Sequence, residues 1–147
     1  MTAAEALGVI LEDASFRFAD DGLASILIGD ALEIVIQQGE DDFKCIAWAG
    51  IADAACVTQP FLLDALRFNN IHKNDTDIVF SLDSNANLIV GRIALCMSEL
   101  TITQAEKALN RFVETCAVMK ACISAPAGDG GDKTGPTGEE QFVSRLA

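Results

Sequence analysis

The chain has 147 residues, of which half are apolar, and it carries a formal net charge of −12. This length suits a single domain that can bury a real core, and the apolar content excludes disorder along the whole chain. The acidic surface repels phosphates and anionic lipid, so we expect no nucleic-acid partner and no membrane insertion.

The first half of the chain predicts one helix followed by three strands. Residues 3–14 place apolar side chains at helical spacing, with Thr2 as the N-cap and Glu5 completing a capping box. The stretches "LASILIG" and "ALEIVIQQ" alternate as strands and meet at Gly29-Asp30, which predicts a two-residue hairpin. After a polar turn, "FKCIAWAG" predicts the third strand.

The second half predicts a helix, a hairpin and a last helix. Pro60 suits the first turn of the helix "FLLDALRFNN", and Asn69-Asn70 suits a left-handed residue at its end. The stretches "IVFSL" and "LIVGRIALCM" form the hairpin, and Thr103 with Glu106 forms a capping box for the last helix. The order is α-β-β-β-α-β-β-α, an α+β domain with an antiparallel sheet of about five strands flanked by helices.

The composition changes abruptly after residue 124. The stretch "APAGDGGDKTGPTG" contains five glycines and two prolines, which is typical of a flexible linker. We therefore expect one domain over residues 1–124 and a flexible Gly/Pro-rich tail over residues 125–147.

Residues suited to catalysis or metal binding are few. The five cysteines are odd in number and lack C-x-x-C spacing, which indicates reduced, buried thiols and no zinc site. His72 is the single histidine, and we expect a solvated residue near a helix end. The acidic residues cluster in turns and predict a solvated surface rather than a calcium site or a catalytic carboxylate pair. With no nucleotide-binding or hydrolase motif, the sequence predicts a binding protein without catalytic residues, metal or cofactor.

The N-terminal stretch "MTAAEALGVILEDASF" does not have the pattern of a secretory signal. It lacks a basic start, and acidic residues interrupt its apolar ones. No stretch approaches the roughly 18 apolar residues needed to cross a bilayer. We therefore expect a cytoplasmic protein. Its several apolar faces, each expected as core when taken alone, together predict self-association or a groove for a peptide.

Five stretches match a known family in sequence order. They are "AAEALGVILEDA", "DGLASILIGDALEIVIQQ", "QPFLLDALRFNN", "DIVFSLDSNANLIVGRIAL" and "LTITQAEKALNRFVETCAVMKA". In this pattern the chain resembles the class I type III secretion chaperones, the Tir chaperone family of small acidic bacterial proteins. The resemblance spans about residues 3–123.

The resemblance implies a cytoplasmic bacterial homodimer that holds the N-terminal region of a secreted effector in a partly extended form. The dimer interface would then lie on the middle helix, at Phe61, Leu62, Ala65, Leu66 and Phe68. The effector contacts would lie on the first helix and the first strands, at Leu7, Ile10, Leu11, Leu32, Ile34 and Ile36. The secretion-system ATPase is a further partner that the resemblance suggests, and no cofactor is implied.

Two alternatives remain open at the level of sequence. One is a small dimeric interaction module of the roadblock or longin type, which also combines an antiparallel sheet with helices. Roadblock-type modules place a helix between the second and third strands, whereas here three strands precede the middle helix. The other alternative is an enzyme with an acidic site of unfamiliar design, which a metal-dependent activity would reveal.

Overall fold

The computed structural model describes residues 1–29, 32–71 and 78–124 of the chain. Its elements, in order, are α1 (Ala3–Ile10), β1 (Leu23–Ile28), β2 (Leu32–Gln38), β3 (Lys44–Asp53), the short 3-10 helix η1 (Ala54–Cys56), α2 (Gln59–Ile71), β4 (Val79–Asp83), β5 (Leu88–Cys96) and α3 (Ile102–Ser124). The predicted α-β-β-β-α-β-β-α order is confirmed. The predictions for His72 and for the C-terminal tail fall outside the described residues.

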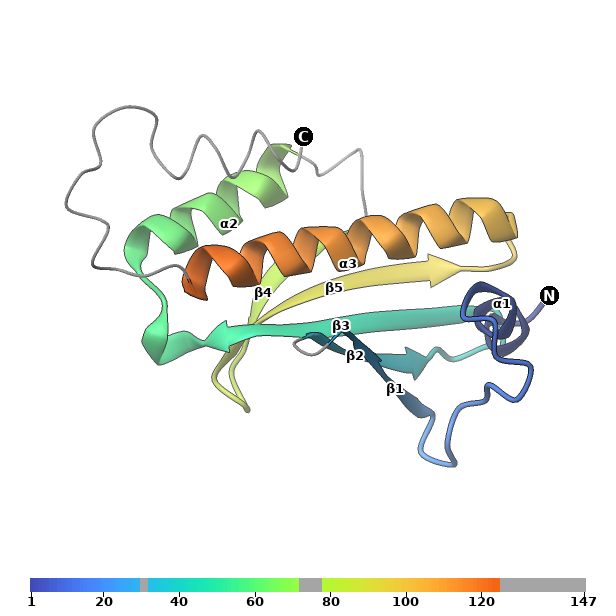
Figure 1. Cartoon of the computed structure of the whole chain (residues 1–147). Coiled ribbons are helices and arrows are strands. Elements are labelled where there is room, and N and C mark those ends of the chain that lie inside the picture. Colours follow the sequence, from blue (N-terminus) through green and yellow to red (C-terminus); the bar gives the residue numbers. More distant parts are fainter. Residues whose placement is uncertain (30–31, 72–77, 125–147) are drawn as a thin grey trace.

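The five strands form one antiparallel sheet in the order β1-β2-β3-β5-β4, so β1 and β4 are its two edges (Figure 1). The α+β architecture predicted from the sequence is therefore confirmed. The chain passes from β2 to β3 through a turn at residues 39–43. A roadblock-type module would carry a helix at this point, so the topology separates this chain from that alternative.

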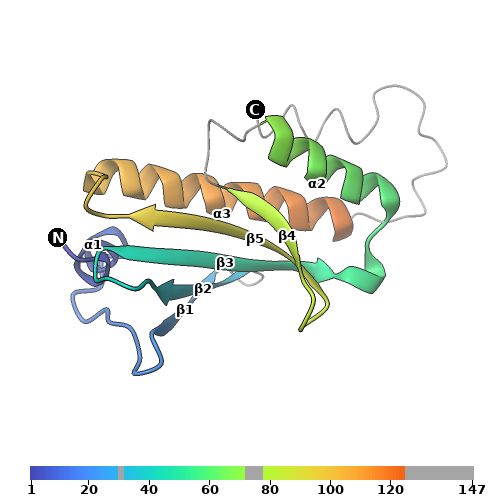
Figure 2. The same cartoon turned by 180° about the vertical axis from the view of Figure 1, so that it is seen from behind.

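The long helix α3 packs on one face of the sheet and runs along β3 and β5 in both views, while α1 packs against α3 and α2 against β4 (Figures 1 and 2). The Phe68 ring of α2 meets the Phe80 ring of β4 edge-to-face, with centroids 5.2 Å apart. Gly91 of β5 lies so close to α3 that an added Cβ would stand 2.8 Å from the Sγ atom of Cys116. The same core includes Leu7 of α1, which is fully buried.

The first helix is shorter than its apolar pattern predicts. Its start is as expected, because the N–H of Glu5 donates to the Oγ1 atom of Thr2 at 3.2 Å. The helix ends at Ile10 rather than at residue 14, because Glu12 adopts a φ of 54°, which a right-handed helix does not allow. Leu11 is the C-cap residue and is only half-buried.

The capping box of α3 lies two residues before the predicted one. The N–H of Gln104 donates to Thr101 Oγ1 at 3.1 Å, and the N–H of Thr101 donates to Gln104 Oε1 at 2.9 Å. The prediction of Thr103 with Glu106 is therefore wrong. Both pairs obey the same local spacing, and the helix begins at Ile102, directly after Thr101.

Two predicted chain reversals also differ from the structure. The α2 helix continues to Ile71, and neither Asn69 nor Asn70 has a positive φ, so this pair does not end the helix in a left-handed turn. Asn69 instead bonds to β4, which fixes the end of α2 against the sheet. In the first hairpin Ile28 pairs with Leu32, which leaves three residues between the strands rather than two.

Candidate binding surfaces

The edge strand β1 lacks the features that usually protect a sheet edge. Its sequence, LASILI, contains no charged residue and no proline. Leu27 is 66% exposed, the largest exposed fraction of any large apolar side chain in the described residues, and Leu23 and Ile28 are also exposed. Edge strands usually carry a lysine, a proline or a bulge that discourages pairing. We therefore treat β1 as a candidate site for an added extended segment.

The hydrogen-bonding phase of β1 identifies the peptide groups that face away from the sheet. The N–H of Gln38 donates to the carbonyl oxygen of Gly22 at 2.8 Å, and these two residues are opposite each other in the β1–β2 register. Bonded and non-bonded pairs alternate along an antiparallel ladder. The backbone groups of Leu23, Ser25 and Leu27 therefore face outward.

The outward groups of Leu23 are already paired within the chain. Its N–H donates to the Oδ1 atom of Asp21 at 3.0 Å, and its carbonyl oxygen accepts from the N–H of Ala19 at 2.9 Å. Within the described part of the chain, no such partner covers Ser25 or Leu27. The open edge of β1 thus consists of the outward-facing backbone groups of Ser25 and Leu27, and the side chain of Leu27 is itself exposed.

The outer face of α2 is a second candidate surface. Leu62, Leu63 and Leu66 are exposed there, and Leu66 is 63% exposed. Of the residues predicted for a dimer interface, Leu62 and Leu66 lie on this face. The other three predicted residues share the opposite stripe of the helix and are buried in the core of the chain: Phe61, Ala65 and Phe68. A spacing of four and then three residues puts them on one side of a helix.

Most of the predicted effector contacts lie in the core rather than on a surface. Four of them are at most 4% exposed: Leu7, Leu32, Ile34 and Ile36. The β2 residues face the helices, so a partner cannot reach these side chains in the folded chain. Ile10 and Leu11 are half-buried at the end of α1. Leu27 of β1 and Leu63 of α2 were not predicted as surface residues. For Leu27 a signal was present, because an uncharged strand at the end of a meander identifies a sheet edge.

A hollow of about 990 Å³ lies on the sheet face away from α3, and its lining also includes Asn69 of α2. Ile46, Arg92 and Ala94 of β3 and β5 line it. The guanidinium carbon of Arg92 lies 5.9 Å from the ring centre of Trp48, which is a cation–π distance. This face therefore combines apolar side chains with a cation held over an aromatic ring.

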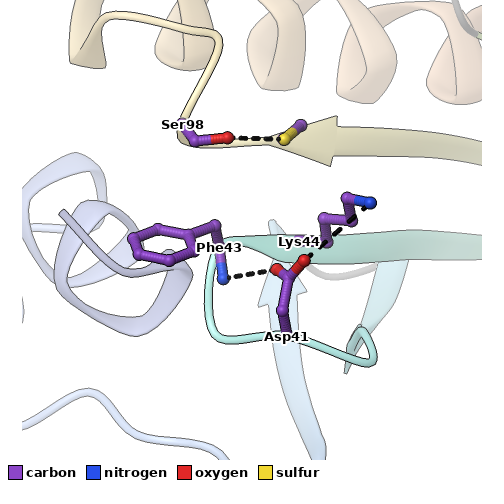
Figure 3. Close-up of polar contacts among 5 residues, drawn as sticks. Asp41, Phe43, Lys44 and Ser98 are labelled. Atoms are coloured by element: carbon purple, nitrogen blue, oxygen red, sulfur yellow. Dashed lines mark hydrogen bonds and ion pairs between the residues drawn. The ribbon is translucent and has the colours of Figure 1, made fainter.

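The turn before β3 closes one end of the sheet (Figure 3). The Oδ1 atom of Asp41 accepts from the N–H of Phe43 at 2.9 Å, and its Oδ2 atom lies 3.8 Å from the Nζ atom of Lys44. On the neighbouring strand the Sγ atom of Cys96 lies 3.1 Å from the Oγ atom of Ser98. The exposed Phe43 ring points toward α1 (Figure 3).

This end of the sheet is acidic. The turn contains Glu40-Asp41-Asp42, and it lies beside the start of β1 because Gln38 and Gly22 are paired there. Carboxylates gathered at one end of an open strand attract basic side chains of a partner, more strongly at low salt.

The five thiols of the chain differ in burial, with Cys96 half-buried between two buried and two exposed ones. Burial raises the pKa of Cys45 to about 11 and that of Cys116 to about 12, so both stay protonated and unreactive at neutral pH. Cys56 and Cys122 are exposed, so the prediction that the cysteines are buried is wrong for these two. None of the five cysteines, which all lie in the described residues, is in a disulfide bond.

Across residues 1–29, 32–71 and 78–124, no group of three His, Cys, Asp or Glu residues is placed to hold a metal ion. Within the same ranges, no helix combines the length and the apolar character that crossing a membrane requires.

Three solved structures share this arrangement. The ExsC–ExsE complex matches with a TM-score of 0.66 and 13% identity, covering 84% of this chain and 97% of that chain. The HopA1–SchA chaperone–effector complex matches with a TM-score of 0.64 and 13% identity, over 80% of this chain and 90% of that one. The Yersinia pestis type III secretion chaperone SycH, in complex with a stable fragment of YscM2, matches with a TM-score of 0.58 and 16% identity, over 79% and 98%. The chain has the fold of the class I type III secretion chaperones.

The likeness to these chaperones is one of fold. No family model matches the chain, and no curated protein matches it in sequence. The predicted chaperone fold is confirmed, while the narrower assignment to the Tir family stays a prediction.

Proposed function

We propose that this chain is a chaperone for a type III secretion effector in the bacterial cytoplasm. It binds an extended stretch of the effector's N-terminal region and keeps that protein soluble and competent for secretion, without catalysis. The observation that carries this proposal is the uncharged, exposed edge of β1 in a fold whose solved neighbours hold a second protein. A secretion-system ATPase as a further partner remains an expectation from the family resemblance.

The partner segment adds to β1 as a further strand. Ser25 and Leu27 offer two N–H groups and two carbonyl groups, so an added strand gains up to four main-chain hydrogen bonds, each worth about 0.5–1.5 kcal/mol net. The added strand also covers the exposed Leu27 side chain. Such a segment is itself apolar and free of proline, since proline lacks the N–H that the ladder needs.

The charge of the chain adds a second requirement for the partner. Asp20 and Asp21 precede β1, and the acidic turn before β3 lies at the same end of the sheet. A partner with lysine or arginine next to its apolar stretch places that cation beside these carboxylates. The association rate therefore falls as salt is added.

Leu27→Lys tests the proposed edge. A lysine on an edge strand opposes pairing, so the variant should lose binding to the N-terminal fragment of the secreted protein that co-purifies with the native chain. Leu82→Lys is the matched control, because Leu82 is 55% exposed and lies in the other edge strand, β4. Equal binding by both variants, measured by calorimetry on folded protein, would remove β1 from the proposal.

We further propose that the chaperone acts as a homodimer through the outer face of α2. Leu62, Leu63 and Leu66 form an exposed apolar patch that a second copy covers around a twofold axis. Two chains of −12 each give −24, so charge repulsion opposes the dimer and apolar contact has to outweigh it. Added salt screens the repulsion and strengthens association.

Leu66→Asp tests the dimer without disturbing the core, because Leu66 is exposed. Light scattering should give twice the 15.6 kDa chain mass for the native protein and 15.6 kDa for the variant. Leu82→Asp serves as the control, since it adds the same charge to an exposed leucine outside α2. A dimer that survives Leu66→Asp would place the interface on another surface.

A further inference from the structure

Asn69, near the end of α2, satisfies both backbone groups of one strand residue. Its Nδ2 atom donates to the carbonyl oxygen of Phe80 at 2.9 Å, and its Oδ1 atom accepts from the N–H of Phe80 at 2.9 Å. In an antiparallel sheet, a residue of a neighbouring strand makes this same pair of bonds. The carboxamide of Asn69 thus occupies the place of one residue of a sixth strand.

The contact between Asn69 and Phe80 lies at an edge of the sheet. β4 is an edge strand that pairs only with β5, and Phe80 is opposite Gly91 in that pairing. The bonds to Asn69 show that the backbone groups of Phe80 face outward. The Phe68 ring one residue earlier in α2 packs edge-to-face on the Phe80 ring, which holds the helix and its asparagine in place.

We infer that Asn69 is a specificity-determining residue that closes the β4 edge to strand addition, so that an extended partner is directed to β1. A strand approaching β4 would bond to alternate residues, which here are Phe80 and Leu82, and Phe80 is the second residue of this five-residue strand. With Phe80 occupied, the approaching strand loses both bonds there and meets α2 in its path. The β1 edge instead offers Ser25 and Leu27 in succession.

Sequence composition alone does not protect β4. Its sequence, VFSLD, contains no lysine and no proline, and Leu82 is 55% exposed. Its one charged residue, Asp83, is the last of the strand and accepts from the N–H groups of Asn85 and Ala86 in the following turn. Such a strand would invite pairing with a second copy or with an unfolded chain. A side chain from a helix supplies the protection that charge or proline gives elsewhere. This inference concerns the β4 edge and holds whether or not the partner at β1 is an effector.

Asn69→Leu tests the inference, because leucine has nearly the same shape and neither donor nor acceptor. In hydrogen-exchange NMR the Phe80 amide should exchange about tenfold faster than in the native protein, while the Val90 amide across the hairpin is unchanged. Light scattering should show a mass that rises with concentration above that of the native protein. Asn110→Leu, at an exposed asparagine of α3, controls for the added apolar surface and should change neither measurement.

A second substitution in the Asn69→Leu background identifies the surface responsible. Leu82→Lys places a charge on the newly opened edge and should return the mass to the native value while Phe80 exchange stays fast. If Asn69→Leu unfolds the chain, Asn69→Asp retains the acceptor for the Phe80 N–H and should raise its exchange by a smaller factor. Native exchange at Phe80 in either folded variant, or an increase in mass that Leu82→Lys fails to reverse, would overturn the inference.

Discussion

Gly91→Ala should destabilise the chain because the position has no room for a methyl group. An added Cβ would lie 2.8 Å from the Sγ atom of Cys116 and 3.1 Å from the Cε1 atom of Phe80, where ordinary contact begins at 3.4 Å. Both partners are buried, so α3 or β4 has to move by several tenths of an ångström. Overpacking of this kind costs about 1–3 kcal/mol in the free energy of unfolding.

Thermal unfolding followed by circular dichroism measures this cost. At about 4 °C per kcal/mol for a domain of this size, the melting temperature should fall by about 4–12 °C. Gly50→Ala is the matched control, since Gly50 is also a strand glycine and an added Cβ there meets nothing within 4 Å. The control should leave the melting temperature unchanged or slightly higher.

A double substitution separates steric overlap from other effects of the alanine. Cys116→Ala removes the sulfur atom, so Gly91→Ala should cost about 1 kcal/mol less in that background than in the native chain. Strict additivity of the two substitutions would refute the overlap between β5 and α3. A native melting temperature for Gly91→Ala alone would refute the close packing itself.

Two further predictions follow from burial. Desolvation raises the pKa of Asp64 above its ordinary value of 3.8, against the opposing charge of Arg67. The folded state therefore binds this proton more readily, and stability is lost as pH rises through the raised pKa. In urea unfolding, Asp64→Asn should have a higher free energy of unfolding than the native chain at neutral pH, and this difference should disappear near pH 3.8. A difference that stays constant with pH would contradict the raised pKa. In thiol labelling of folded protein, Cys56 should react at once and Cys116 only on unfolding, and early labelling of Cys116 would contradict the packing of α3.

The element order was accessible from the sequence because it depends on local periodicity. The alternation in β2 and the long apolar stripe of α3 are properties of a few adjacent residues. The ends of the helices could not be predicted where two local signals compete. Thr101 and Thr103 each satisfy the capping spacing, and the structure uses Thr101. Residues 3–14 suit a helix throughout, yet the chain turns at Glu12.

Which apolar residues are exposed on the candidate surfaces could not be predicted from the sequence either. Leu27 and Ile34 are both apolar residues of adjacent strands, and apolar character alone does not distinguish them. Ile34 lies under the helices at 2% exposure, while Leu27 is on the outward edge. The sequence predicted one interface from Phe61, Leu62, Ala65, Leu66 and Phe68 of the middle helix, whereas the structure buries three of them and exposes Leu62 and Leu66, because exposure depends on where the sheet lies.

The sequence by itself determined the kinds of elements, their order and the acidic character of the surface, because backbone preference, side-chain period and charge are local properties. Only the tertiary structure decided which strands are edges and which apolar faces are covered. It also decided that Asn69 meets Phe80, since contacts between residues far apart in the chain arise when the whole sheet and its helices pack. The binding surfaces belong to this second class, because an exposed edge is defined by what does not pack against it.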